Sequence, residues 1–590
     1  MAAPIEGYAS ATSVAPGDAI DFCVRANAAN QHFTMEIYRR GVEDKLVTSA
    51  AGDAFVPGSQ DDANLAVNGC NWPAASGCRT VIPADWSSGY YVAKLSSSGE
   101  ETWIPFIVRA AAPTSKVLVK ISDTTAQAYT GWGGRSFYST PFSPRISFDR
   151  PFDNLDLYEK YQLPFLQWAE NLGFTMDYCS SLDLHTNSQQ LANYRLFLSL
   201  GHDEYWSLEM RDQVEAFIAS GGNVCFFSAN TCFWQIRFDF SGGARIMICY
   251  KEAEAGHPRD PDRSDPRRVT TEWSQPPVSR PENSMTGVSY LNGAGWWVDP
   301  VDPARRYRGY TVCNASHWTF DSSGLNDGDT FGAGDSVDTT MLGYETDAAL
   351  LAPGTNPPEV TGADGTPKNF IVLGTADLTD WKANGQGGHA TMGMYQRNGI
   401  VFTGGTVNWA AGLNTTPAGQ ISQNLLRELS TDPIRITLTN AGFEDWQGGQ
   451  PAGWALDGAG SISAEDSDPD ANDNNMRFNG GGNFSLHVDA TAGDTWISQS
   501  DFACDPNTTY GAGCWAKSDR PGATIRLQTT DTWQDFAVAE HSGGGGWEYL
   551  FAIGAANGDG PVPSRVKIQV ASGTQASFDD VSVLEAKAYN

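Results

Sequence analysis

The sequence predicts a protein of several domains that combines all-β and α/β structure. Three regions of different sequence pattern along its 590 residues indicate this. Residues 1–112 hold short alternating strands between Gly, Pro, Asn and Ser residues, which is typical of a β-sandwich. Residues 113–432 alternate apolar strands with helical patterns, which predicts a doubly wound parallel sheet. Residues 433–590 return to short strands with Gly and Asn turns, which predicts a second β-sandwich.

The individual elements follow this order along the chain. The first domain carries alternating runs at 20–24, 33–38 and 90–95, and a small-residue linker at 110–113 precedes the central strands and helices. In the central domain we expect strands at 116–121, 174–178, 369–374 and 399–404, and a helix over 155–172. The irregular stretch 251–283 is rich in Pro, Asp and Arg, and its length favours a lid over the site.

The composition excludes some classes of partner. A net charge of −31 argues against nucleic acid and anionic membrane surfaces as partners, since both would repel the chain. No apolar run reaches the roughly 18 to 20 residues that span a bilayer, and the first residues lack a basic and apolar leader. The compartment stays open between the cytoplasm and secretion with a signal peptide removed, and homo-oligomer formation also stays open.

The ten cysteines do not form a recognisable framework. No CxxC pair or Cys/His spacing typical of zinc occurs. Cys70 could pair with Cys78, and Cys504 with Cys514, but spacing alone does not establish the geometry of a disulfide.

The most informative motif is Gly201-His202-Asp203-Glu204-Tyr205-Trp206-Ser207. It follows an apolar run at 194–200 that suits a buried strand, and Ser207 can cap a helix over 208–219. The motif therefore lies at the carboxyl end of a strand, where α/β sheets collect catalytic groups.

A second polar residue is expected at the same edge of the sheet. The next predicted strand, 223–228, runs out at Asn230, so His202, Glu204 and Asn230 converge if the two strands are parallel neighbours. The alternative is that Asp203 and Glu204 only precede a helix, where its dipole favours acidic residues, and that His202 forms a hydrogen bond with a nearby backbone group.

The last domain is rich in tryptophan, a residue that stacks on sugar rings. We expect Trp446, Trp496 and Trp533 to bind carbohydrate, although some of the six tryptophans beyond residue 433 must belong to the core. The acidic stretch 464–470 could hold calcium, but it fits no EF-hand spacing and is more often a solvated loop.

Residues 115 to about 430 resemble the large (beta) subunit of N,N-dimethylformamidase. The resemblance lies in Gln127–Gly134, Ser147–Pro151, Gly201–Ser207, Arg280–Gly287, Gly343–Asp347 and Ala390–Gly393. It implies a glutamine-amidotransferase-like α/β fold that has lost its nucleophilic cysteine, and neither candidate strand end here presents Gly-x-Cys-x-Gly.

The resemblance also implies a mononuclear Fe(III) centre held by two tyrosines and one glutamate. The glutamate maps onto Glu204 and one tyrosine onto Tyr129; for the other tyrosine the choice is Tyr91, with Tyr138 as the substitute. Two phenolates and a carboxylate offset the three charges of ferric iron, and such an ion polarises a carbonyl and acidifies water. A packed aromatic residue is the alternative for Tyr129.

The same resemblance assigns roles around the metal. His202 would shuttle protons or orient the carbonyl, Asn230 would hydrogen-bond the substrate or the oxyanion, and Glu345 would act as a base beside them. For Glu345 a non-catalytic role is equally open. Asp149 and Arg150 are expected to form a structural ion pair or to anchor a loop rather than to act in catalysis.

The last domain resembles jelly-roll carbohydrate-binding modules through Asn440–Trp446 at its start and Phe578–Val583 at its end. In such modules the opening glutamate and the closing aspartate often flank a structural calcium ion, so Glu444 and Asp580 are candidates for calcium ligands.

Three functional hypotheses follow. The first is an iron-dependent hydrolase that cleaves a C–N amide bond of a small or glycan-linked substrate, with polysaccharide bound by the last domain and with or without a small partner subunit. The second is a polysaccharide-active enzyme, either a glycoside hydrolase or a lyase, that uses His202, Glu204 and Glu345. The third is a non-catalytic glycan-binding protein.

Overall fold

The computed structural model divides the chain into two compact units. It describes residues 5–153, 155–298, 302–432, 435–466, 484–506, 508–558 and 560–589. Unit 1 joins residues 1–214, 223–394 and 401–430, and unit 2 joins residues 215–222, 395–400 and 431–590. The N-terminal strands therefore share a unit with the central sheet.

The N-terminal part of unit 1 consists of antiparallel strands around their own core. Its main sheet has the order β2 (Ser13–Val14), β9 (Glu100–Val108), β8 (Gly89–Ser97), β5 (His32–Arg40) and β6 (Asp44–Asp53). A second pair, β1 (Ile5–Ala9) and β4 (Phe22–Ala26), supplies the other side of this core. Alternate residues of β5, such as Met35 and Ile37, are fully buried, which is the pattern read from the sequence.

A nine-stranded mixed sheet forms the centre of unit 1. Its order is β12 (Asp177–Ser180), β10 (Val117–Ile121), β13 (Leu196–His202), β15 (Asn223–Ala229), β25 (Ile400–Thr403), β24 (His389–Gln396), β22 (Ile371–Asp377), β19 (Tyr310–Val312) and β20 (Thr330–Phe331). The five strands from β12 to β25 are parallel, and β24, β22, β19 and β20 pair antiparallel with one another. The parallel strands are buried almost throughout, because helices cover both faces.

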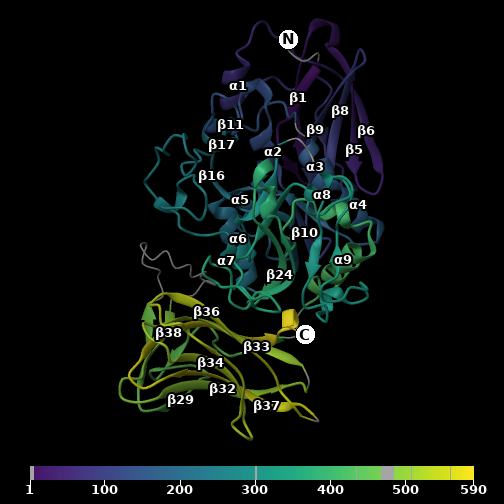
Figure 1. Ribbon diagram of the computed structural model, residues 1–590. Helices are drawn as coiled ribbons and strands as arrows, with labels where there is room; N and C mark the ends of the chain where they lie inside the picture. The colour runs from purple at the N-terminus through teal and green to yellow at the C-terminus, as the bar shows by residue number, and fades with distance from the viewer. Residues whose placement is uncertain are drawn as a thin grey trace. The chain divides into compact units, whose positions relative to one another are not determined.

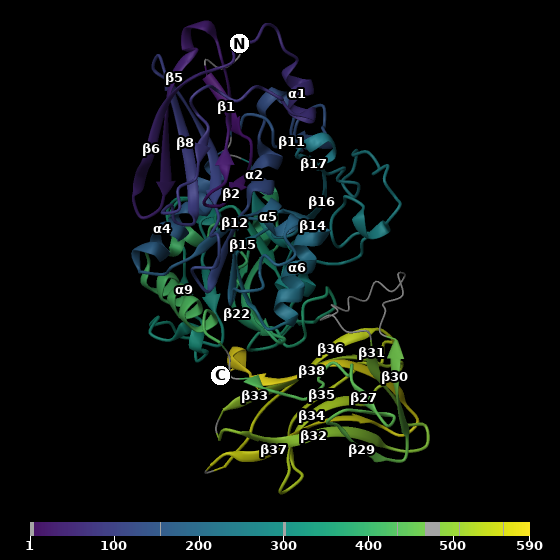
Figure 2. The ribbon, with the colours of Figure 1, turned by 180° about the vertical axis from the view of Figure 1, so that it is seen from behind.

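Helices lie on both sides of this sheet. In both ribbon views, α4 (Leu163–Asn171) and α9 (Thr416–Leu429) lie on one side, and α2 (Asp123–Tyr129) and α5 (Ser181–Thr186) lie on the other (Figures 1 and 2). The helix predicted over 155–172 is two helices, since α3 (Asp156–Tyr161) ends before α4 begins. Pro164 explains the break, because proline lacks the N–H group that would continue the first helix.

Two small sheets extend the central one towards the site. One has the order β11 (Arg145–Ser147), β17 (Ile246–Ile248), β16 (Trp234–Asp239) and β14 (Tyr205–Ser207). The other joins β21 (Glu345–Ala348), β18 (Ser289–Trp296) and β23 (Gly385–Gln386).

The segment predicted to be a lid is anchored to unit 1. Asp260 is 1% exposed and accepts hydrogen bonds from Arg237 at 2.6 Å and from the Thr270 N–H at 2.8 Å. Trp273 is fully buried. This irregular stretch is therefore fixed by polar and apolar contacts.

Unit 2 is built mainly from two antiparallel sheets that enclose one core (Figure 1). The first has the order β30 (Ser461–Asp466), β31 (Phe484–Asp489), β38 (Gln575–Glu585), β33 (Thr509–Lys517) and β36 (Trp547–Ala555), with β26 (Arg435–Ile436) on β38. The second has the order β29 (Ala455–Gly458), β32 (Thr495–Cys504), β37 (Val562–Val570), β34 (Ala523–Thr529) and β35 (Asp535–Glu540). Multiple β-sheet layers, as the sequence predicts, thus make up most of the protein.

None of the ten cysteines forms a disulfide, so the two pairings considered from the sequence are wrong. Cys70 and Cys78 are buried in separate hydrophobic clusters, which keeps their sulfur atoms apart. Within the described residues, no helix is both long and apolar enough to cross a lipid bilayer.

Candidate active site

Two neighbouring parallel strands bring His202 and Asn230 to one edge of the central sheet. His202 is the last residue of β13 and is in register with Ala229, the last residue of β15. Asn230 follows immediately, with a positive φ of 47°. Gly201 has a φ of 68°, and a side chain there would meet Tyr161, so glycine is required just before His202.

Glu204 is held between two tyrosine hydroxyl groups. The Tyr129 hydroxyl donates to Glu204 Oε2 at 2.9 Å, and the Tyr138 hydroxyl donates to Glu204 Oε1 at 2.9 Å. The two rings stack with centroids 4.3 Å apart. Tyr205 donates to the Tyr138 hydroxyl at 2.8 Å, and the Glu204 N–H group donates to Thr125 Oγ1 at 2.9 Å. We call Tyr129, Tyr138 and Glu204 the tyrosine–glutamate cluster.

Tyr91, the first choice for the second tyrosine, does not reach this cluster. It lies on β8 in the core of the N-terminal sheet, where it is 1% exposed. Its hydroxyl donates to the Ser87 carbonyl at 2.8 Å, and its ring stacks on Trp86. The alternation of β8 turns the side chain into that core, so Tyr138, the substitute, takes the place expected for Tyr91.

A second group of side chains surrounds His202. Its Nε2 atom lies 3.1 Å from Glu345 Oε2 and 3.4 Å from the Tyr129 hydroxyl. Glu345, on β21, also accepts from Asn230 Nδ2 at 3.3 Å and from Trp297 Nε1 at 2.8 Å. All four residues predicted to be catalytic, His202, Glu204, Asn230 and Glu345, therefore lie together.

Burial and neighbouring charges set the protonation of these groups. Burial disfavours the imidazolium form of His202, but the Glu345 carboxylate outweighs it and raises the pKa of His202 to about 9. Burial also acts on Glu345, yet the His202 charge and the hydrogen bonds hold the pKa of Glu345 below its ordinary value. His202 and Glu345 are thus an imidazolium–carboxylate pair at neutral pH.

The tyrosine–glutamate cluster is protonated on its phenols. Burial, followed by the Glu204 charge, raises the pKa of Tyr129 and that of Tyr138 well above the ordinary value. Burial also raises the pKa of Glu204, while His202 and the Lys251 ammonium oppose this effect. The side chain of Tyr138 is 46% exposed, although its hydroxyl points inward, so the cluster reaches solvent along this ring.

Asp203 has a structural role beneath the site. Its Oδ1 atom lies 2.5 Å from Lys120 Nζ, and both side chains are fully buried. Its Oδ2 atom accepts from the Ser199 hydroxyl at 2.6 Å. Asp203 thus anchors the turn that presents His202 and Glu204.

Arg150 does not pair with Asp149, which binds Arg245 instead. The Arg150 guanidinium donates to carbonyl groups and to Gln127.

The donor chemistry of the cluster fits a hard metal ion. In the described part of the chain, no group of three or more His, Cys, Asp or Glu side chains is arranged to hold a metal ion. Hard metal ions also bind phenol oxygens. Two phenol oxygens within hydrogen-bond distance of one carboxylate are a donor set of this kind. Within the same described part, the buried atoms His202 Nδ1, Asn230 Oδ1 and Tyr290 Oη lack a hydrogen-bond partner, which leaves polar groups for a bound molecule.

Several contacting residues were not expected from the sequence. Tyr205 lies inside the 201–207 motif, and Asp347 lies two residues after Glu345 on the same strand, so both had a local signal. Asp347 accepts from the Asn230 N–H group at 2.7 Å and fixes that turn. Trp297 and Lys251 lie in irregular segments with no motif, and only the folded chain brings them to the site.

In unit 2, Trp496 and Trp533 lie on one face of the second sheet. Lys567 Nζ lies 4.5 Å from the Trp496 ring centroid, and the Arg565 guanidinium lies 4.3 Å from that of Trp533. Arg565 and Lys567 are two residues apart on β37, so both point away from the core. Trp533 is 59% exposed.

The other residues predicted in unit 2 have different surroundings. Trp446 packs against the core, and its indole N–H group donates to the Phe443 carbonyl at 2.5 Å. Glu444 accepts from the Phe484 N–H group at 2.9 Å. Asp580 has a φ of 51° and follows the buried Asp579. Calcium binding by Glu444 and Asp580 stays a prediction, and residues 467–470 of the acidic stretch lie outside the described residues.

The fold and the site together define a protein with a mixed central sheet, flanked by helices, that presents a buried cluster of tyrosine, glutamate and histidine at a sheet edge. A family model described as "N,N-dimethylformamidase beta subunit-like, C-terminal" matches residues 34–423. The chain belongs to this family. Among proteins with curated descriptions, none matches the sequence.

Solved structures match part of the chain at low identity. A tailspike protein of bacteriophage CBA120 is 13% identical over 25% of this chain and 21% of its own, with a TM-score of 0.20. A two-module xylanase of Clostridium thermocellum is 15% identical over 26% and 29%, with a TM-score of 0.19. A family 61 carbohydrate-binding module in complex with β-1,4-galactotriose is 17% identical over 26% and 99%, with a TM-score of 0.19. The chain thus spans under a third of the tailspike and the xylanase.

Proposed function

We propose that the protein hydrolyses a C–N amide bond at an iron centre held by Tyr129, Tyr138 and Glu204. The observation that carries this proposal is the pair of tyrosine hydroxyl groups on separate oxygens of one buried carboxylate. Membership of the N,N-dimethylformamidase-like family supports an amide as the substrate. Ferric iron bound there would supply Lewis-acid activation of the amide carbonyl and of water.

The surrounding residues provide the proton transfers that hydrolysis needs. Water adds to the carbonyl carbon and gives a proton to the His202–Glu345 pair, the C–N bond breaks, and the leaving nitrogen takes up a proton from the same pair. His202, whose Nε2 atom lies 3.1 Å from Glu345 Oε2, is the donor suited to that nitrogen, because the Glu345 carboxylate favours the charged form of the ring. Glu345 orients the ring and stabilises its charge.

Asn230 is the group suited to orient the substrate. Its Nδ2 atom is engaged with Glu345, and its buried Oδ1 atom has no partner within the described chain. That oxygen can accept an N–H bond from an amide that carries one. The glutamine-amidotransferase-like ancestry of the central domain is part of the same proposal, supported by five parallel strands with helices on both sides.

Iron content and the visible absorption spectrum of the purified protein test the centre. We expect about one iron per chain and a broad phenolate-to-iron band. Glu204→Gln should lose the iron, and Tyr138→Phe should weaken or shift the band. Tyr91→Phe is the matched control, since it removes one buried tyrosine hydroxyl elsewhere in unit 1 and should leave both readouts unchanged. A colourless, iron-free protein after reconstitution would overturn the metal assignment.

The iron content and the same glutamate variants also distinguish amide hydrolysis from polysaccharide cleavage. If an iron-free protein cleaves a polysaccharide and Glu204→Gln or Glu345→Gln abolishes that cleavage, the same cluster is an acid–base pair for glycosidic chemistry. Amide hydrolysis that depends on iron excludes that result for this cluster.

We also propose that unit 2 binds polysaccharide through the face that carries Trp496 and Trp533. The supporting observation is the exposed Trp533 ring. Its contact Arg565 lies two residues before Lys567, the contact of Trp496, on β37. Retention of the whole protein on insoluble polysaccharides tests this. Trp533→Ala should reduce retention, while Phe484→Ala, which removes an exposed ring from the other sheet, should not. Equal retention of all three proteins would refute the assignment of this face.

A further inference from the structure

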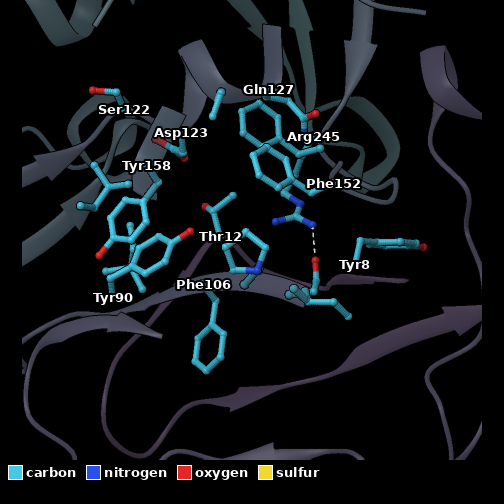
Figure 3. Close-up of a pocket in the computed structure, with 18 of the residues that line it drawn as sticks. Tyr8, Thr12, Tyr90, Phe106, Ser122, Asp123, Gln127, Phe152, Tyr158 and Arg245 are labelled. Carbon is cyan, nitrogen blue, oxygen red and sulfur yellow. Dashed lines mark hydrogen bonds between the residues drawn. The ribbon is translucent and has the colours of Figure 1, made fainter. Parts of the chain in front are cut away.

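A cavity separate from the tyrosine–glutamate cluster lies between the N-terminal strands and helices α2 and α3 (Figure 3). It contains about 670 Å³ of empty space, including the solvent at its mouth. Aliphatic, polar and aromatic side chains form its walls, and the aromatic ones are Tyr8, Tyr90, Phe106, Phe148, Phe152 and Tyr158. Tyr90 and Tyr158 stack with ring centroids 3.5 Å apart. A mostly apolar lining with a few polar groups is typical of a small-molecule site.

Two charged side chains enter this cavity with unused hydrogen-bonding atoms. Asp123 Oδ2 and Arg245 Nη1 are both buried, and neither has a hydrogen-bond partner within the described residues. In Figure 3 the Asp123 carboxyl group and the Arg245 guanidinium group face the same space, with Thr12 between them. Buried polar atoms are nearly always paired, so an acceptor and a donor left open in one cavity point to a missing ligand.

The Asp123 carboxyl group forms no ion pair within the described residues, although the Lys120 ammonium group acts on it from a distance. Its Oδ1 atom accepts from the Ser181 N–H group at 2.7 Å, and no ion pair to Asp123 occurs within the described chain. Burial raises the pKa of Asp123 to about 6, so it is mostly ionised at neutral pH. A carboxylate among aromatic rings favours an organic cation, since the ring faces also attract positive charge.

The Arg245 end of the cavity offers a hydrogen-bond donor rather than a free charge. Arg245 already binds Asp149 through Nε at 3.0 Å and through Nη2 at 2.6 Å, and Nη2 also donates to the Ala9 carbonyl at 2.7 Å. Arg150, the other guanidinium in the wall, donates through Nε, Nη1 and Nη2 to protein acceptors. The one open nitrogen, Arg245 Nη1, therefore calls for an acceptor oxygen.

We propose that this cavity binds a small molecule that has an apolar body, an ammonium group for Asp123 and a carboxylate or carbonyl oxygen for Arg245. The apolar body lies against the Tyr90 and Phe106 walls. This site is distinct from the proposed catalytic centre, although α2 contributes to both, with Asp123 at its start and Tyr129 at its end. The proposal does not depend on amide hydrolysis.

Calorimetric titration of the full-length protein with three probes tests the site. The probes are 2-phenylethylamine, which has only the ammonium group, 3-phenylpropionate, which has only the carboxylate, and L-phenylalanine, which has both. We expect L-phenylalanine to bind most tightly and 2-phenylethylamine to bind at least about tenfold more weakly to Asp123→Asn than to the unaltered protein.

The control is Asp156→Asn, which removes the same charge from an aspartate that is 73% exposed on α3. It should bind all three probes as the unaltered protein does. Equal affinity of 2-phenylethylamine for the unaltered protein and for Asp123→Asn would overturn the role of Asp123, and so would no binding of that probe. If L-phenylalanine binds no more tightly than 2-phenylethylamine, the role of Arg245 is wrong. Thermal unfolding without probes checks that both variants are folded.

Discussion

The buried pair of Lys120 and Asp203 allows a stringent test of how the site is supported. Both side chains are fully buried, the charged atoms lie 2.5 Å apart, and Lys120 Nζ also lies 4.7 Å from the Trp206 ring centroid. Lys120→Met fills a similar volume but leaves the Asp203 carboxylate without its countercharge. Removing one partner of a buried pair costs about 3–5 kcal/mol of unfolding free energy.

The double variant separates the cost of an unpaired charge from the cost of the lost contact. In Lys120→Met combined with Asp203→Asn no buried charge remains, and the asparagine oxygen can still accept from Ser199, so most of the loss should be recovered. Urea unfolding at pH 7, followed by tryptophan fluorescence, measures the difference for the transition of unit 1. The control Lys160→Met breaks the exposed pair with Asp156 and should change stability by less than about 1 kcal/mol.

Two results would refute this reasoning. One is a loss below about 1 kcal/mol for Lys120→Met, which would mean that water or another group compensates Asp203. The other is a double variant as unstable as the single one, which would mean that packing rather than charge determines the loss.

Two further predictions concern unit 1. Gly201→Ala should lower the unfolding free energy by more than about 2 kcal/mol, because φ is positive and the new Cβ would lie 2.6 Å from Tyr161 Cβ; an alanine variant as stable in urea as the native protein would contradict this. Burial raises the pKa of Glu282 from 4.5 to about 7. The protonated Glu282 therefore stabilises the fold fully below pH 4.5, and about 3 kcal/mol of unfolding free energy is lost as the pH rises through 7. Glu282→Gln should remove this slope in urea titrations at pH 5 and pH 8, and an unchanged slope would disprove the assignment.

The sequence predicts those parts of the site that neighbouring strands position. His202 and Asn230 end two parallel strands in register, so their convergence follows from strand order alone. Tyr91 fails as a site residue because strand alternation turns it into another core. Tyr138 follows no periodic element, so its approach to Glu204 depends on the fold of an irregular segment.

The limits of the fold prediction have similar physical causes. The strands of the central sheet are visible as buried apolar runs, whereas the break between α3 and α4 depends on Pro164 within a helical pattern. The partner of Asp203 is 83 residues away along the chain, and no local pattern marks Lys120 for that role.

The buried cysteine thiols can report local opening of the structure around them. Nine of the ten thiols are buried, and Cys313 is partly exposed. A thiol reagent should therefore modify one site quickly and the others only when the surrounding structure opens. Cys225 in the central sheet and Cys514 in unit 2 would then time the opening of each unit separately, without any introduced label.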